Sequence, residues 1–148
     1  MSRSILQLCA GLLLIVASEV QAAEYVSVKE SHAFFYDAPS TKAKKLFVVN
    51  RFMPLEQVVV LDSWVKVRDK SGNLYWVEKN KLSSTRYVFA LLPVVDVLDK
   101  PDEGASKVFQ VRQQIALEFL EATGTGWIKV KHQDGETGYV RSAEVWGG

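Results

Sequence analysis

Aromatic and basic residues alternate with valines over Trp64–Val77, whose sequence is WVKVRDKSGNLYWV. Indole rings beside ammonium and guanidinium groups can stack on a ligand and donate charge-assisted hydrogen bonds to it. A face of this kind suits sugars, peptides or carboxylates. Large aromatic residues also fill small cores and the contacts between domains, so a packing role stays open beside the binding role. The candidate ligand-binding residues are Tyr36, Trp64, Lys66, Arg68, Trp76, Trp127, Lys129 and Tyr139.

The chain contains a second copy of this stretch, WIKVKHQDGETGYV, at Trp127–Val140. In each copy, apolar and polar residues alternate up to a glycine-containing turn, after which an aromatic residue and a valine follow, as in a β-hairpin. Side chains alternate between the two faces of a strand, so this pattern separates core residues from outward residues. The predicted core residues are Val65, Val67 and Val77 in the first copy, and Ile128, Val130 and Val140 in the second.

The turn glycines set the predicted register of both hairpins. A loop of odd length centred on Gly72 places Lys66 opposite Glu78, where an ion pair can form. The same register places Arg68 opposite Trp76, where a cation–π contact can form. The second hairpin is predicted to be centred in the same way on the corresponding glycine.

The duplication extends over most of the chain. Tyr25 recurs as Tyr87, and Phe47 recurs as Phe109, both at a spacing of 62 residues. The spacing becomes 63 only at the Gly-rich loop Thr123–Gly126, immediately before the second copy of the hairpin. A spacing that is maintained over several strands indicates two copies of one domain.

The two predicted domains are residues 24–83 and 86–148, joined by the linker Ser83–Thr85. Regular short strands without helical periodicity predict an all-β fold of two tandem small β-barrels. A domain of about 60 residues buries only about 60% of its unfolded surface, and a linker this short prevents independent motion. We therefore expect the two barrels to pack on each other.

Composition and motifs give little support to several function classes. The net charge of +1 at pH 7 gives no reason to expect nucleic acid as a partner. His32 and His132 occupy unrelated positions in the two repeats, whereas a metal site normally needs several converging ligands. The sequence has no nucleophile-elbow serine and no Gly-rich phosphate loop. We predict no catalytic residues, no metal and no cofactor, and we expect the protein not to be an enzyme.

Residues 1–22 have the features of a secretory signal peptide. Arg3 precedes the apolar run Ile5–Val16, and Val20–Ala22 supplies small residues where a signal peptidase cleaves. The run is shorter than the roughly 20 residues that span a bilayer, so we expect no stable membrane insertion after cleavage. The one cysteine, Cys9, would be removed with this segment, leaving no thiol for disulfides, zinc or nucleophilic catalysis. We expect a secreted, periplasmic protein.

The sequence resembles bacterial SH3 domains arranged in tandem. The family's repeat has a loop with a Pro-Ser segment, a strand of the type G/S-W-V-K-V, a D/S-G turn and an aromatic-Val strand. The matching segments are Asp37–Ser40, Ser63–Val67, Ser71-Gly72 and Trp76-Val77, then Asp99–Pro101, Gly126–Val130, Asp134-Gly135 and Tyr139-Val140. The chain is similar to secreted proteins of Gram-negative bacteria that consist of such a pair. The resemblance implies two five-stranded barrels and a binding role in the cell envelope.

The chain departs from eukaryotic SH3 domains after the last strand of each hairpin. Those domains grip proline-rich peptides partly with a Pro-Ser-Asn-Tyr segment, whereas the two copies here read Glu78–Lys81 and Arg141–Glu144. Recognition of proline-rich helices is therefore not expected. Two functions stay open, with peptidoglycan or envelope proteins as the respective partners. The first is a module that binds peptidoglycan or its stem peptides through the aromatic and basic face, and the second is a periplasmic protein–protein adaptor.

Overall fold

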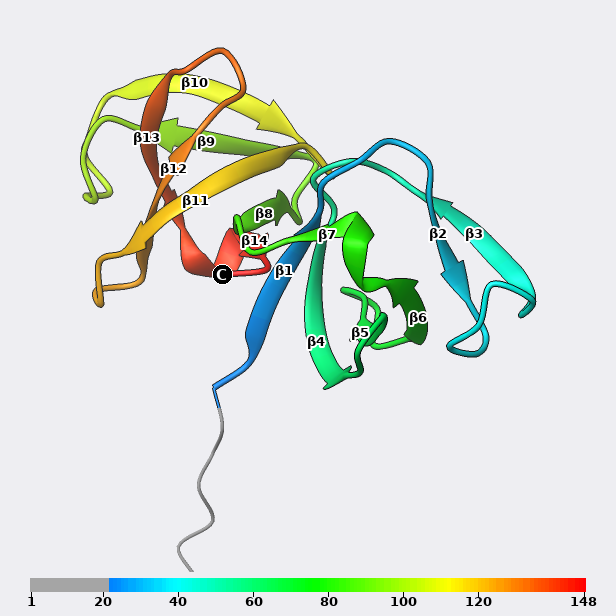
Figure 1. The fold of residues 1–148 in the computed structure, drawn as a ribbon. Helices are drawn as coiled ribbons and strands as arrows, with labels where there is room; N and C mark the ends of the chain where they lie inside the picture. The colour runs from blue at the N-terminus through cyan, green and yellow to red at the C-terminus, as the bar shows by residue number, and fades with distance from the viewer. Residues whose placement is uncertain (1–21) are drawn as a thin grey trace, which may run out of the picture.

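The computed structural model describes residues 22–148. The predicted signal peptide lies outside these residues, apart from Ala22. Two seven-stranded antiparallel sheets make up the described part of the chain (Figure 1). The first contains β1 (Glu24–Val28), β2 (Ala33–Tyr36), β3 (Lys45–Val49), β4 (Pro54–Val60), β5 (Trp64–Arg68), β6 (Leu74–Glu78), the 3-10 helix η1 (Lys79–Lys81) and β7 (Leu82–Ser83). The second contains β8 (Tyr87–Ala90), β9 (Val94–Leu98), β10 (Lys107–Arg112), β11 (Ala116–Ala122), β12 (Trp127–Lys131), β13 (Thr137–Arg141), the 3-10 helix η2 (Ser142–Glu144) and β14 (Val145–Trp146).

The strand order is the same in both sheets. It runs β3-β2-β6-β5-β4-β1-β7 in the first sheet and β10-β9-β13-β12-β11-β8-β14 in the second. The prediction of an all-β, duplicated fold is confirmed. Each sheet has seven strands rather than the expected five; one of the two additional strands is the two-residue strand after each 3-10 helix, and the sheet stays open between its end strands. In the described part of the chain, no helix is long and apolar enough to cross a membrane.

The alternating valines form the core of each sheet, as predicted. All six predicted core residues are at most 4% exposed, because side chains on one face of each hairpin point into the barrel. Leu55 and Leu117, which occupy matching positions on β4 and β11, complete the two cores and are fully buried. The outer faces of the same strands therefore remain available for other contacts.

The predicted hairpin register is wrong by two residues: each residue of β5 lies opposite the β6 residue two positions before the one predicted. Lys66 lies opposite Trp76, and Arg68 lies opposite Leu74. The cause is the turn: the amide of Gly72 donates to the carbonyl of Asp69 at 3.0 Å, and the glycine has a φ of 87°. Gly72 is thus the left-handed residue that ends a four-residue turn, so it lies past the centre of the loop.

The second hairpin repeats this correction. Trp127 lies opposite Arg141, and Ile128 lies opposite Val140. The amide of Gly135 donates to the carbonyl of His132 at 3.0 Å, which matches the turn of the first hairpin. Both hairpins therefore share one turn geometry that differs from the symmetric loop predicted.

Aromatic contacts join the two sheets, as the expectation of packed barrels requires. Tyr25 on β1 meets Trp146 on β14 edge to face, with ring centroids 5.4 Å apart. Phe52, in the turn before β4, stacks on Tyr87 of β8 at 4.5 Å. The guanidinium of Arg86 lies between the two domains' rings, 5.8 Å from the ring centroid of Tyr25 in the first domain and 3.9 Å from that of Phe119 in the second. β1 and β7 accordingly lie beside β8 and β14 (Figure 1).

Candidate functional site

An open pocket of about 440 Å³ lies beside Trp64 in the first domain. Three loops meet there, and the amide of Lys79 at the start of η1 donates to the carbonyl of Ser63 at 2.9 Å. This bond fixes η1 against the β4–β5 loop. The lining residues are Thr41, Asp62, Ser63, Trp64, Glu78, Lys79 and Asn80.

Tyr36 supports this pocket from beneath. Its ring meets Trp64 edge to face with centroids 5.0 Å apart, and its side chain is only 3% exposed. Its hydroxyl donates to Oε1 of Glu78 at 3.3 Å. Burial and the neighbouring carboxylate of Glu78 both raise the pKa of Tyr36, so the phenol keeps its proton and remains a donor. Tyr36 therefore positions Trp64 and Glu78 rather than lining the pocket.

The charge of the pocket differs from the predicted aromatic and basic face. Two acidic residues, Asp62 and Glu78, and the basic residue Lys79 all line it. Sequence reasoning missed these three residues, because the loops that carry them converge only in the folded domain. An indole wall with both signs of charge can hold a ligand that has an apolar stem, an amine and a carboxylate.

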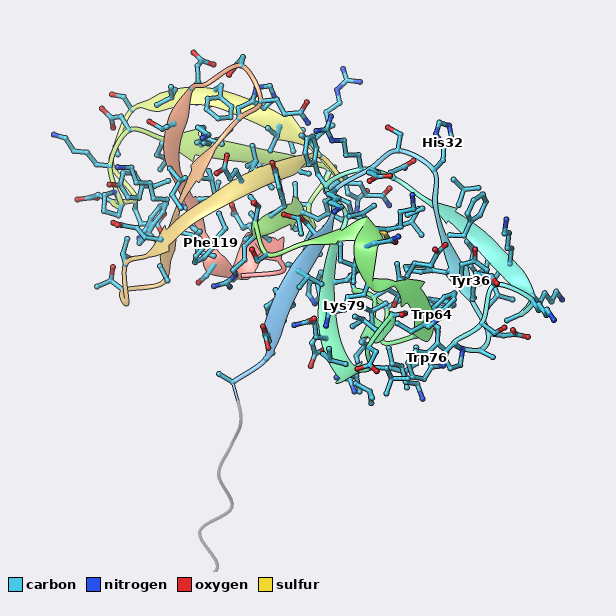
Figure 2. All side chains as sticks on the ribbon, viewed as in Figure 1. His32, Tyr36, Trp64, Trp76, Lys79 and Phe119 are labelled. Carbon is cyan, nitrogen blue, oxygen red and sulfur yellow. The ribbon has the colours of Figure 1, made fainter. Side chains whose placement is uncertain are left out.

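Lys66 and Trp76 lie beside one another on the outer face of the same sheet. The Lys66 ammonium is 5.8 Å from the Trp76 ring centroid, so the cation–π contact involves Lys66 and not Arg68 as predicted. Figure 2 shows Tyr36, Trp64, Trp76 and Lys79 in the first domain, with Phe119 in the second. Trp76 is half-buried and pairs with Tyr36 across β6 and β2.

Arg68 is separated from the pocket by its own ion pair. Its Nη1 atom donates to both carboxylate oxygens of Glu56 on β4, at 3.0 and 2.9 Å. Arg68 and Glu56 line a different depression of about 380 Å³, together with Glu24 at the start of β1. The structure thus divides the predicted face, because β4 lies next to β5 and supplies a carboxylate.

In the second domain, Trp127 is buried, with only 8% of its surface exposed, although alternation predicts an outward side chain. The guanidinium of Arg141 lies 5.2 Å from its ring centroid and covers it. The Nε atom of Arg141 donates to Oε1 of Glu103 at 2.7 Å, and its Nη2 atom donates to Oε2. Its Nη1 atom donates to Oε1 of Glu144 at 3.2 Å. These contacts explain why Trp127 is shielded from solvent on the outward face of β12.

Lys129 and Tyr139 occupy the positions in the second domain that Lys66 and Trp76 occupy in the first. They lie opposite each other on β12 and β13, and both are half-buried. Five of the eight candidate residues thus lie in the first domain and three in the second, and those three match Trp64, Lys66 and Trp76. Only Trp64 among them lines the pocket of the first domain.

Metal-ligating side chains do not gather in the described part of the chain. Residues 22–148 contain no group of three or more histidine, cysteine, aspartate or glutamate residues that could hold a metal ion. His132 lies with its Nδ1 atom 2.9 Å from Oδ2 of Asp134, within the turn of the second hairpin.

Two sheets of identical strand order, each with a 3-10 turn before a short last strand, define a tandem pair of small SH3-like domains. The family model described as bacterial SH3 domain matches residues 29–84 and again residues 93–147. The chain therefore belongs to the bacterial SH3 domain family. A search of curated proteins finds no match.

Two solved structures resemble the fold at low sequence identity. One, titled the structure of NlpC2 from Trichomonas vaginalis, is 10% identical with a TM-score of 0.40, over 84% of this chain and 48% of that one. The other, titled the structure of NlpC1 from the same organism, is 13% identical with a TM-score of 0.41, over 92% of this chain and 50% of that one. The chain thus spans at most half the length of these two proteins.

Proposed function

We propose that this protein is a non-catalytic binding module of the bacterial cell envelope, and that the Trp64 pocket takes peptidoglycan stem peptides. The observation that carries the proposal is the combination of an indole wall with carboxylates and an ammonium in one open pocket. Stem peptides carry free amines, carboxylates and short aliphatic side chains. Each of these groups has a chemical counterpart in the pocket.

The proposed roles follow from charge. Asp62 and Glu78 attract an amine of the ligand, and Lys79 attracts a carboxylate. Trp64 supplies apolar contact for the aliphatic portion. Because the pocket is open to water, each charged contact contributes little, on the order of 0.2–1 kcal/mol. We therefore expect the pocket to bind weakly.

A protein–protein adaptor is the alternative function, and one feature favours it. Four consecutive apolar residues at the end of β4 and in the following loop are each at least 40% exposed: Val58, Val59, Val60 and Leu61. Contiguous exposed apolar residues often mark surfaces that bind other proteins. The second domain has glutamate, alanine and threonine at three of the four matching positions, so this strip belongs to the first domain.

Cosedimentation with purified sacculi tests the proposed function. The mature protein should sediment with sacculi, and the retained fraction should fall as salt rises, because screening weakens the charged contacts. A parallel pull-down from periplasmic extract tests the adaptor. Retention by a protein of the extract, with none on sacculi, would reject the cell-wall proposal in favour of the adaptor.

The proposed location in the periplasm rests on the predicted signal peptide, which lies outside the described residues. Cleavage after Ala22 should yield an exported chain that begins at Ala23. Intact-mass analysis of the protein from the envelope fraction measures this directly. A mass that includes Met1 would contradict export by this route.

A further inference from the structure

The second domain has an ion pair at the place where the first domain has its pocket. Glu103, in the β9–β10 loop, occupies the position that matches Thr41, and Arg141 occupies the position that matches Glu78. Thr41 and Glu78 line the open pocket of the first domain. In the second domain, the carboxylate of Glu103 instead binds the guanidinium of Arg141 above Trp127.

The guanidinium of Arg141 has two edges with different roles: one is held in place within the domain, and the other binds a carboxylate that a ligand can replace. Its Nη1 atom donates to Glu144 three residues later, at the end of η2, which holds the guanidinium in place. The Nε and Nη2 atoms form the other edge, and both donate to the carboxylate of Glu103. Two parallel donors on one edge are the arrangement by which arginine recognises a carboxylate of any origin.

We propose that the second domain contains a carboxylate-binding site, with Arg141, whose guanidinium lies over the ring of Trp127, as its anchor, and that Glu103 of the same chain occupies it. This inference is independent of the proposed role of the first domain. The ligand class is a molecule with a free carboxylate, such as the carboxyl end of a peptide. Glu103 occupies the site in the absence of ligand.

The internal occupant is weakly held and therefore replaceable. The side chain of Glu103 is 70% exposed, and that of Arg141 is 37% exposed. Exposed ion pairs of this kind favour the paired state by only a few fold, up to about fivefold. An incoming carboxylate makes the same two hydrogen bonds to Arg141. Competition from Glu103 should reduce the apparent affinity by the fraction of time that the site is closed.

A titration of the full mature chain tests the site through the indole N–H signal of Trp127 in nitrogen-15 NMR spectra. The probe is N-acetyl-Ala-Ala with a free carboxyl end, and its C-terminal amide is the control. The acid should shift the Trp127 signal and the amide should not. The signal of Trp64 reports separately on the first domain, so the two sites are distinguished in one experiment.

Glu103→Gln removes the internal carboxylate and should tighten binding of the acid by about fivefold. Glu121→Gln, at an exposed position on β11, is the matched control and should leave the affinity unchanged. Arg141→Gln should abolish the shift at Trp127. Sodium acetate separates the two sources of a carboxylate: acetate binding as tightly as the peptide would support the site but assign it to small acids.

Three results would overturn the inference. The first is equal affinity in the parent and in Glu103→Gln, since Glu103 would then not compete. The second is an equal shift with the amide probe, since the carboxylate would then not be recognised. The third is a Trp127 signal that the acid leaves unmoved in both proteins.

Discussion

Trp127→Ala should lower the free energy of unfolding by about 3–5 kcal/mol, as deletions of buried aromatic residues do. Trp127 is only 8% exposed and lies beneath the guanidinium of Arg141. Trp64→Ala should cost less, about 1–2 kcal/mol, because Trp64 is half-buried and one side faces the open pocket. Urea denaturation followed by circular dichroism measures both losses without depending on tryptophan emission.

The two substitutions control for each other, because Trp64 and Trp127 start the matching strands β5 and β12. The chemical change is identical, and only the surroundings differ. Equal losses of stability would contradict the conclusion that the two domains use this tryptophan differently. A third variant, Trp127→Phe, should restore most of the lost stability if apolar packing is the cause.

The sequence predicted the core and the fold because both depend on a local pattern. Alternating valines such as Val65 and Val67 place one face of the strand in the core. This assignment does not depend on which strands are its neighbours. The same pattern of apolar and polar residues occurs in both repeats, so a chance match to the hairpin pattern is implausible. The prediction of the hairpin register was wrong because glycine suits two positions equally well. It can stand at the centre of a loop or, as Gly72 does, at the left-handed end of a turn.

The candidate site was predicted less well because it depends on which strands are neighbours. Alternation placed Arg68 on the outer face, but its partner Glu56 is on β4, which the pattern alone could not assign to that side. Trp127 was predicted to lie on the outward strand face, with packing and binding roles both open; it is buried because Arg141, held by Glu103 of a distant loop, covers it. Ion pairs between distant segments thus decided which outward residues are available.

A signal for the pocket was nevertheless present in the repeat. Core positions are similar in the two copies, whereas the positions around the tryptophan change charge: Thr41 becomes Glu103, and Glu78 becomes Arg141. Residues that differ in charge between copies of one fold are candidates for different ligands, because the fold itself does not require either charge. Comparison of the copies by position would have added Thr41 and Glu78 to the candidate residues.

Trp64→Ala should weaken binding to sacculi by about 2 kcal/mol, roughly thirtyfold, if Trp64 is the anchor of the proposed pocket. The loss should exceed that from any charged residue of the pocket, because the indole provides most of the apolar wall and the charges remain solvated. Cosedimentation at several concentrations of sacculi measures the shift. Circular dichroism must show that the variant is folded under the same conditions.

Trp76→Ala is the matched control for this loss of binding. It removes the same side chain from the outer face of the same domain, but Trp76 pairs with Tyr36 across the sheet and does not line the pocket. Binding should therefore change little. If both variants lose binding equally while folded, the ligand lies across the wider surface of Trp64, Lys66 and Trp76, and the pocket is the wrong site. If neither variant loses binding, the ligand does not contact this face, because an indole at the wall of an occupied pocket cannot be removed without loss of contact area.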